Sequence, residues 1–139
     1  MRLEVPRRAT RLCLIGSLLL SGCAAQEPEW TPLFNGEDLT GWTPKIRGSA
    51  LGEDPAGTFR VEDGLLTVGY DRYDAFDARF GHLFWEAPLS HYRLLVEYRF
   101  VGEQAAGGPD WALRNSGVMF HAQAPEPMGR DQDFPISLD

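Results

Sequence analysis

The sequence predicts one all-β domain built of antiparallel strands. Its length of 139 residues fits a single domain. Hydrophobic residues make up 43% of the chain and aromatic residues 12%, which is enough for a packed core and too much for a disordered protein. From residue 30 onward, apolar and polar side chains alternate with the period of two that marks a β-strand, and no window of about eleven residues carries a helical stripe.

The charge balance excludes one class of partner. The chain has 13 basic and 20 acidic residues, a formal net charge of −7 and a single lysine, Lys45. A nucleic-acid-binding protein draws much of its affinity from clustered lysine and arginine side chains that neutralise phosphates. We therefore expect no nucleic-acid partner.

The first 22 residues have the layout of a secretion signal. Arginines outnumber acidic residues before an apolar run at 12–20, and small residues follow that run. The run is too short to span a bilayer as a mature helix. A basic start, an apolar middle and a small-residue cleavage site predict that residues 1–22 are a signal peptide that is removed.

Residues 20–23 also resemble a bacterial lipobox. The letters LSGC place Cys23 directly after small residues at the end of the apolar run. In such a signal the cysteine thiol is acylated, and Cys23 becomes the first residue of the mature protein. An ordinary signal peptide that happens to contain a cysteine is the alternative.

A short tether is expected between the lipid and the domain. Residues 23–29 have little apolar content, and the domain follows at 30–139. Ala24 and Ala25 come after the cysteine, with no aspartate at the sorting position. By analogy with known lipoproteins, we expect a bacterial cell-envelope protein, anchored by its lipid at the outer membrane or the periplasmic face.

A hairpin is the first element expected in the domain. Residues 58–62 and 65–68 are short strand-like runs, and Asp63 and Gly64 stand between them. An Asp-Gly pair tolerates the positive φ angles that a two-residue hairpin turn requires. Residues 70–80, rich in aspartate and arginine, then form a loop.

Residues 91–101 predict a longer strand, because they alternate cleanly. One face is apolar and is expected to point into the core. It comprises Tyr92, Leu94, Val96, Tyr98 and Phe100. The other face is at least partly wet and carries Arg93, Leu95, Glu97, Arg99 and Val101.

Two more strands are expected after the glycine- and alanine-rich loop at 102–109. In residues 116–121, Val118 and Phe120 point to the core. Residues 136–139 begin another strand, and there the sequence stops. Because only about five or six strands can be counted, we expect an incomplete sandwich. The polar side of the first of these strands carries Asn115, Gly117, Met119 and His121.

Four segments, in chain order, carry a family resemblance. They are LFNGEDLTGW at 33–42, FRVEDG at 59–64, NSGVMFH at 115–121 and DQDFPIS at 131–137. Any one of them is a weak signal, but four in this order are specific. Together they resemble the signatures of the 3-keto-disaccharide hydrolase family, and the resemblance covers nearly all of the domain.

The resemblance implies a fold. The family is similar to the concanavalin A-like lectins and glucanases, a jelly-roll sandwich of two curved antiparallel sheets whose concave face holds sugar. Relatives continue past residue 137 with a hydrophobic strand that carries an acidic residue and a glutamine, followed by several more strands. Asp139 stands where that acidic residue belongs, so the chain resembles a C-terminally truncated member.

The resemblance also implies a secreted or periplasmic enzyme, a hydrolase or lyase that cleaves 3-keto-glucosides and related disaccharides. In such a substrate the C3 ketone acidifies the C2 proton. A base can then start an elimination that expels the C1 leaving group, and water adds back afterwards. His121 is the candidate base, since imidazole titrates near neutral pH. Asp139 is the second catalytic candidate, and a surface histidine without a role is the alternative for His121.

Four residues are expected to bind the oxidised saccharide. Asn115 could donate to a sugar hydroxyl or to the enolate, or it is a turn residue. Trp111 could stack on a sugar face. Glu97 and Arg99 share a strand face and could line the same groove, or they form an exposed face without a partner.

A divalent metal cation is the one cofactor that the residues suggest. Asp139, together with Asp131, Gln132 and Asp133, could supply oxygen ligands, and the cation would serve as the electrophile. A merely solvated acidic loop is the alternative. His82 and His91 border expected strands and are assigned no role.

A second class of function stays open beside the enzyme. A non-catalytic carbohydrate-binding lipoprotein would use the same concave sheet without chemistry, because a fold alone does not fix a function.

Overall fold

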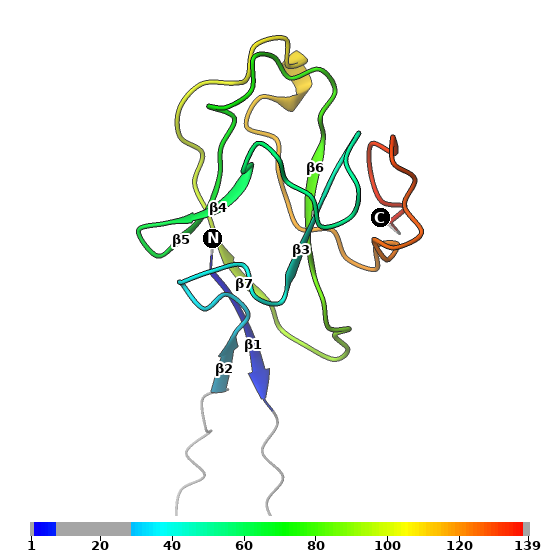
Figure 1. The fold of residues 1–139 in the computed structure, drawn as a ribbon. Coiled ribbons are helices and arrows are strands. Elements are labelled where there is room, and N and C mark those ends of the chain that lie inside the picture. The colour runs from blue at the N-terminus through cyan, green and yellow to red at the C-terminus, as the bar shows by residue number, and fades with distance from the viewer. Residues whose placement is uncertain (1, 8–28, 138–139) are drawn as a thin grey trace, which may run out of the picture.

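The structure is a computed structural model that describes residues 2–7 and 29–137. Within those residues it has seven β-strands, one short 3-10 helix and no α-helix (Figure 1). Every strand pair is antiparallel, so the predicted all-β, antiparallel fold class is confirmed. The elements are β1 (Arg2–Arg7), β2 (Glu29–Pro32), β3 (Trp42–Ile46), β4 (Phe59–Glu62), β5 (Leu65–Val68), β6 (Gly81–Trp85), β7 (Leu95–Glu97) and the helix η1 (Asp110–Ala112).

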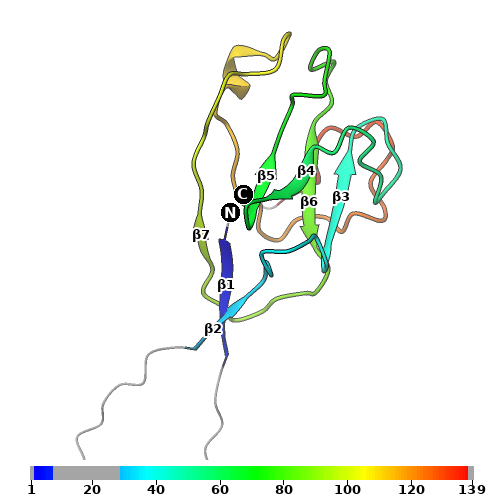
Figure 2. The ribbon, with the colours of Figure 1, turned by 60° about the vertical axis from the view of Figure 1, so that its left-hand side comes forward.

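The described strands form three small sheets, with the orders β2-β1-β7, β3-β6 and β4-β5. In Figure 2 the β2–β1–β7 sheet lies on one side and the two strand pairs lie on the other. This sheet-rich arrangement agrees with the jelly-roll class, with three short sheets in the place of two extended ones.

The β4–β5 hairpin is formed as predicted. Phe59 lies opposite Val68 and Glu62 opposite Leu65, which leaves a two-residue turn. The turn residues Asp63 and Gly64 have φ angles of 50° and 74°. Both angles are positive, which is the backbone conformation that favours an Asp-Gly pair in a hairpin.

The core joins this hairpin to the β3–β6 pair. Gly81 of β6 lies opposite Ile46 of β3. A side-chain carbon on Gly81 would stand 3.3 Å from the Phe59 ring and 3.6 Å from Ile46. The glycine therefore lets the aromatic ring of β4 approach β6 closely. The buried apolar side chains of the described residues are Leu33, Phe34, Ile46, Phe59, Leu66 and Met128.

The signature at 33–42 builds the turn that leads into β3. The side-chain oxygen of Asn35 accepts the backbone N–H groups of Glu37 at 2.8 Å and Asp38 at 3.0 Å. The amide of Asn35 donates to the carboxylate of Asp38 at 2.7 Å, and the N–H of Thr40 donates to the same oxygen at 2.9 Å. The hydrogen bonds that the Asp38 carboxylate accepts lower its pKa, and the bond from Asn35 has the largest effect. The polar residues Asn35 and Asp38 of this signature therefore stabilise the turn.

The alternation of burial predicted for residues 91–101 is present in the first half of the segment, but the predicted long strand is not. Tyr92, Leu94 and Val96 are half-buried, and their neighbours along the chain are exposed. Only Leu95–Glu97 forms a strand, however, and Tyr98 and Phe100 are exposed rather than in the core. The physical reason is pairing, because β7 has three partners in β1 and none of the described residues continues the ladder beyond Glu97.

The predicted strand at 116–121 is wrong for the described structure. These residues have no strand pairing, and Val118, Met119 and Phe120 are all exposed. Ile136 is 72% exposed, and the residues from 136 to 137 form no strand either. An alternating pattern buries one face only when a neighbouring strand pairs with it, and no described strand does so here.

The N-terminal segment holds one unexpected element. β1 falls inside the predicted signal peptide, yet it pairs with both β2 and β7. Residues 8–28, with Cys23 and the predicted cleavage site, lie outside the described residues, so the signal peptide and the lipid anchor stay predictions. Within the part that is described, no helix has the length and apolar character needed to cross a membrane.

Candidate functional site

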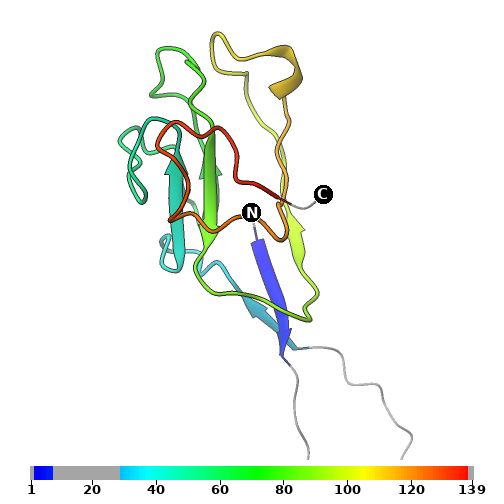
Figure 3. The same ribbon diagram turned by 90° about the vertical axis from the view of Figure 1, so that its right-hand side faces the viewer.

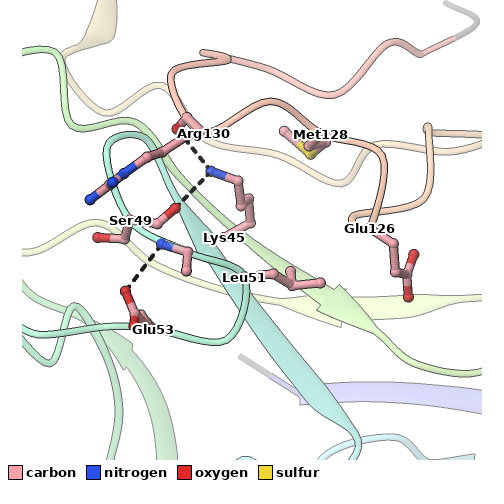
Figure 4. Close-up of a pocket in the computed structure, with 8 residues that line it drawn as sticks. Lys45, Ser49, Leu51, Glu53, Glu126, Met128 and Arg130 are labelled. Carbon is pink, nitrogen blue, oxygen red and sulfur yellow. Dashed lines mark hydrogen bonds between the residues drawn. The ribbon is translucent and has the colours of Figure 1, made fainter.

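A hollow of about 380 Å³ lies at the end of β3 (Figure 4). One wall comes from β3 and the loop after it, and the other comes from the segment at 126–130. Figure 3 shows that segment, in orange and red, running alongside β3 and β6. The lining is mixed in charge and comprises Lys45, Ser49, Ala50, Leu51, Glu53, Glu126, Met128 and Arg130.

Lys45 is the buried cation of this hollow, with only 2% of its surface exposed. Its Nζ donates to three backbone carbonyls, those of Ile46 at 3.2 Å, Ser49 at 3.3 Å and Arg130 at 3.1 Å. An ammonium group has three N–H donors, and a buried one requires partners for them. Lys45 therefore ties the segment at 126–130 to β3, and its donors are all in use.

His82 continues this attachment from β6. It lies opposite Lys45 in the strand pair, and its Nε2 stands 2.7 Å from the carbonyl oxygen of Asp133. Because a carbonyl only accepts, Nε2 carries the proton. Burial lowers the pKa of His82, and the positive charge of Lys45 lowers it further. The hydrogen bond to the Asp133 carbonyl raises the pKa, but by less. The imidazole is therefore neutral at neutral pH.

Arg47 is the third basic residue that holds the same segment. Its Nε donates to the carbonyl of Asp131 at 3.1 Å and lies 2.9 Å from the carboxylate of Asp133. In return, Arg130 donates through Nε to the carbonyl of Gly48 at 2.8 Å. We call Lys45, Arg47 and His82 the basic clasp, since all three bind the chain between residues 130 and 133.

Of the two carboxylates that line the hollow, one has a hydrogen-bond partner and the other has none among the described residues. Glu53 accepts the backbone N–H of Ala50 at 3.1 Å. Glu126 is exposed and has no hydrogen bond or ion pair among the residues that the structure describes. Its carboxylate is therefore free to accept hydrogen bonds from the hydroxyl groups of a polar ligand. Sequence reasoning missed Glu126, because it stands alone between two prolines in no recognisable pattern.

Two of the predicted substrate-binding residues come together at η1. The side-chain amide of Asn115 donates to the backbone carbonyl of Trp111 at 3.0 Å. The Trp111 ring is 58% exposed and stacks on Phe80, with ring centroids 5.9 Å apart and planes 15° apart. An exposed, supported indole ring is a suitable surface for the apolar face of a sugar.

Three other predicted site residues, His121, Glu97 and Arg99, are not part of the lining of the hollow. His121 is exposed with φ at 50°, and it has no bonding partner among the described residues. Glu97, in β7, and Arg99 are exposed as well. Asp139 lies outside the described residues. The roles given to these residues stay predictions.

The metal site that the sequence suggested stays a prediction, because Asp139 lies outside the described residues. They contain no group of three or more His, Cys, Asp or Glu side chains that could hold a metal ion. The amide of Gln132 donates to Gln123 at 2.9 Å and to the carbonyl of Phe134 at 2.7 Å, and Asp133 is paired with Arg47. Gln132 and Asp133 therefore already have protein partners, whereas the side chain of Asp131 has none among the described residues.

The comparison with protein families decides the affiliation of the chain. The family described as the 3-keto-alpha-glucoside-1,2-lyase-like domain matches residues 29–138, well over half of the sequence. The chain belongs to this family. Membership in the 3-keto-alpha-glucoside-1,2-lyase-like family confirms the resemblance carried by the four segments, and it supports a related carbohydrate-active function. No curated protein and no solved structure matches the chain.

Proposed function

We propose that this domain is an enzyme that cleaves 3-keto-glucosides, including 3-keto-disaccharides, by elimination and hydration. The observation that carries the proposal is the family match over residues 29–138. The mixed lining of the hollow and the exposed Trp111 are compatible with a polar, hydroxyl-rich ligand.

The reaction follows from the chemistry of the ketone. A base removes the C2 proton, and the electrons of the C2–H bond form an enolate that the C3 carbonyl stabilises. The enolate then expels the group at C1, whose oxygen takes the bonding electrons and a proton. Water adds across the resulting C1–C2 double bond, with hydroxide at C1 and a proton at C2, and 3-keto-glucose is released.

We assign the base to His121 and the acid for the leaving group to Asp139. One observation supports the role of His121. The residue is exposed and has no hydrogen bond or ion pair among the described residues, so a ligand can reach its imidazole. Asn115 and Trp111 are proposed to hold the sugar, and Glu97 and Arg99 to line the approach. The enzyme would work at the cell envelope, tethered through the lipid on Cys23.

The test is turnover of a 3-keto-disaccharide beside the same disaccharide without the ketone. His121→Ala should lower turnover by about 100-fold or more, which is the usual contribution of a general base. His91→Ala is a matched control, because His91 is also exposed and also has a positive φ, of 56°; it should keep turnover within about twofold. Wild-type protein that binds both saccharides without cleaving either would establish the non-catalytic alternative and reject the enzyme.

A further inference from the structure

A second hollow, of about 480 Å³, shares Ser49 with the first. Its volume is in the range of small-molecule sites. Its polar side chains come from three separate parts of the chain. They are Arg47, Ser49, Asp77, Arg79 and Asp131.

Arg79 has two contacts that position its guanidinium group in this hollow, yet most of its donors are unused. Its Nη2 donates to the carbonyl of Ala75 at 2.8 Å, and its guanidinium carbon stands 4.6 Å from the centre of the Tyr73 ring. The Tyr73 hydroxyl is in turn bonded to the buried Thr58 hydroxyl at 2.6 Å. A guanidinium fixed by stacking and by one hydrogen bond is pre-organised for a ligand.

The Nη1 of Arg79 is the observation that points to a ligand. It has no hydrogen-bond partner among the described residues, it is not one of the buried atoms, and Arg79 forms no ion pair with any of them. The Nε of Arg79 also lacks an acceptor, but it is buried, as is the Nε1 of Trp85, so a ligand oxygen cannot reach it. An oxygen atom of a bound molecule would satisfy Nη1.

A tight turn places Asp77 beside this arginine. The N–H of Arg79 donates to the carbonyl of Phe76 at 2.9 Å, and the two central residues, Asp77 and Ala78, have φ angles of 46° and 51°. An alanine seldom adopts a positive φ, so the surrounding structure must impose this conformation. The turn carries Asp77 and Arg79, an acceptor and a donor, into the same hollow.

The charged side chains that line the second hollow indicate which kind of ligand it could bind. Two guanidinium groups and two carboxylates line the hollow, so their formal charges cancel. A phosphate or sulfate would meet the carboxylates of Asp77 and Asp131, whose side chains have no partners among the described residues. A neutral ligand with adjacent hydroxyl groups would satisfy both kinds of group, since each hydroxyl both donates and accepts.

We propose that this second hollow is a glycosyl-binding site, in which Arg79 donates to, and Asp77 accepts from, neighbouring hydroxyl groups of an unoxidised sugar ring. The proposal rests on the proposed function for the choice of a saccharide among polyhydroxylated ligands. It assigns the site to Arg47, Ser49, Asp77, Arg79 and Asp131, and neither His121 nor Trp111 lines this hollow.

The experiment measures binding of methyl α-glucoside, with inorganic phosphate as the competing probe, by calorimetry or by NMR titration. Arg79→Met and Asp77→Asn should each weaken glucoside binding by at least about tenfold, because each removes a charged hydrogen-bonding partner. Arg114→Met is the matched control, since Arg114 is exposed and outside the hollow; it should change binding by less than twofold. Asp77→Asn decides the matter if the arginine variant does not fold.

Three results would overturn the proposal. The wild-type protein does not bind the glucoside, Arg79→Met and Asp77→Asn bind it as tightly as the wild type does, or the wild type binds phosphate more tightly than the glucoside. The outcome is independent of catalysis, because an unoxidised glucoside is not cleaved by elimination. Turnover of a 3-keto-disaccharide with unchanged glucoside binding in both variants rejects only the second site. Weakened binding in both variants without any turnover by the wild type rejects only the proposed enzyme.

Discussion

Lys45 and His82 lie directly opposite each other in the β3–β6 pair, and their side chains bind two carbonyls of one segment, those of Arg130 at 3.1 Å and Asp133 at 2.7 Å. This segment also supplies Arg130 to the first hollow and Asp131 to the second. A single cross-strand pair therefore positions a wall of each hollow. The stability of this attachment is central to both proposed sites.

Removing the buried ammonium should destabilise the domain. Lys45→Met keeps an unbranched side chain of similar size but leaves three carbonyls without their donor. We expect the free energy of unfolding to fall by about 2 to 4 kcal/mol, measured by denaturant titration. Arg114→Met, at an exposed position, should change it by less than about 0.5 kcal/mol. A Lys45→Met protein as stable as the wild type would show that the attachment contributes nothing.

His82 should make stability depend on pH. Because burial lowers its folded-state pKa below 6.5, the unfolded chain takes up a proton at a higher pH than the folded chain does. The stability that neutral His82 provides is present above pH 6.5 and is lost as the pH falls through 6.5 towards the folded-state pKa.

The variant His82→Gln tests this dependence, because it keeps an N–H donor for the Asp133 carbonyl and cannot titrate. Unfolding free energies between pH 7 and pH 5 should decline less in His82→Gln than in the wild type. His91→Gln should decline as the wild type does, since His91 is exposed. Parallel declines in all three proteins would contradict the assignment of a neutral, half-buried His82.

The hairpin turn should favour glycine over alanine at position 64. Gly64 has φ at 74°, a conformation that costs other residues about 1 to 2 kcal/mol. Gly64→Ala should lower the free energy of unfolding by about that amount. Gly117→Ala is the matched control, because no atom lies within 4 Å of the added carbon and no positive φ is imposed there. Equal effects of the two substitutions would remove the turn as the cause.

The lipid anchor has a direct test in cell fractionation. Replacing Cys23 by Ser removes the only atom that the predicted lipobox can acylate. The protein should then move from the membrane fraction to the soluble fraction, because a peripheral domain held by a lipid alone detaches without it. An unchanged membrane fraction for Cys23→Ser would reject the anchor.

The parts of the fold that could be predicted are those whose signals are local. Two short strand-like runs with Asp63-Gly64 between them were enough to predict the β4–β5 hairpin, and a period of two was enough to predict the inward face of Tyr92, Leu94 and Val96. The strand expected at 116–121 failed because a strand also needs a partner, and pairing partners lie far away in the sequence.

The basic clasp could not be predicted from the sequence either, because its residues also contact partners that lie far away along the chain. Lys45 was visible as the single lysine, and His82 as a histidine with no role, but nothing local indicates that they are opposite each other. Their shared target, between Arg130 and Asp133, is about 50 or more residues from either one. Conversely, the four family segments identified the family correctly, since a family signature does not depend on knowing the contacts.

The most direct test of the proposed chemistry is the fate of the C2 proton when a 3-keto-disaccharide is cleaved in D₂O. Elimination followed by hydration predicts that the released 3-keto-glucose carries one deuterium at C2, at early times and beyond the exchange seen when 3-keto-glucose is incubated without the protein. Cleavage that leaves the original hydrogen at C2 would contradict the account, because the bond at C1 would then have been broken by direct displacement with water.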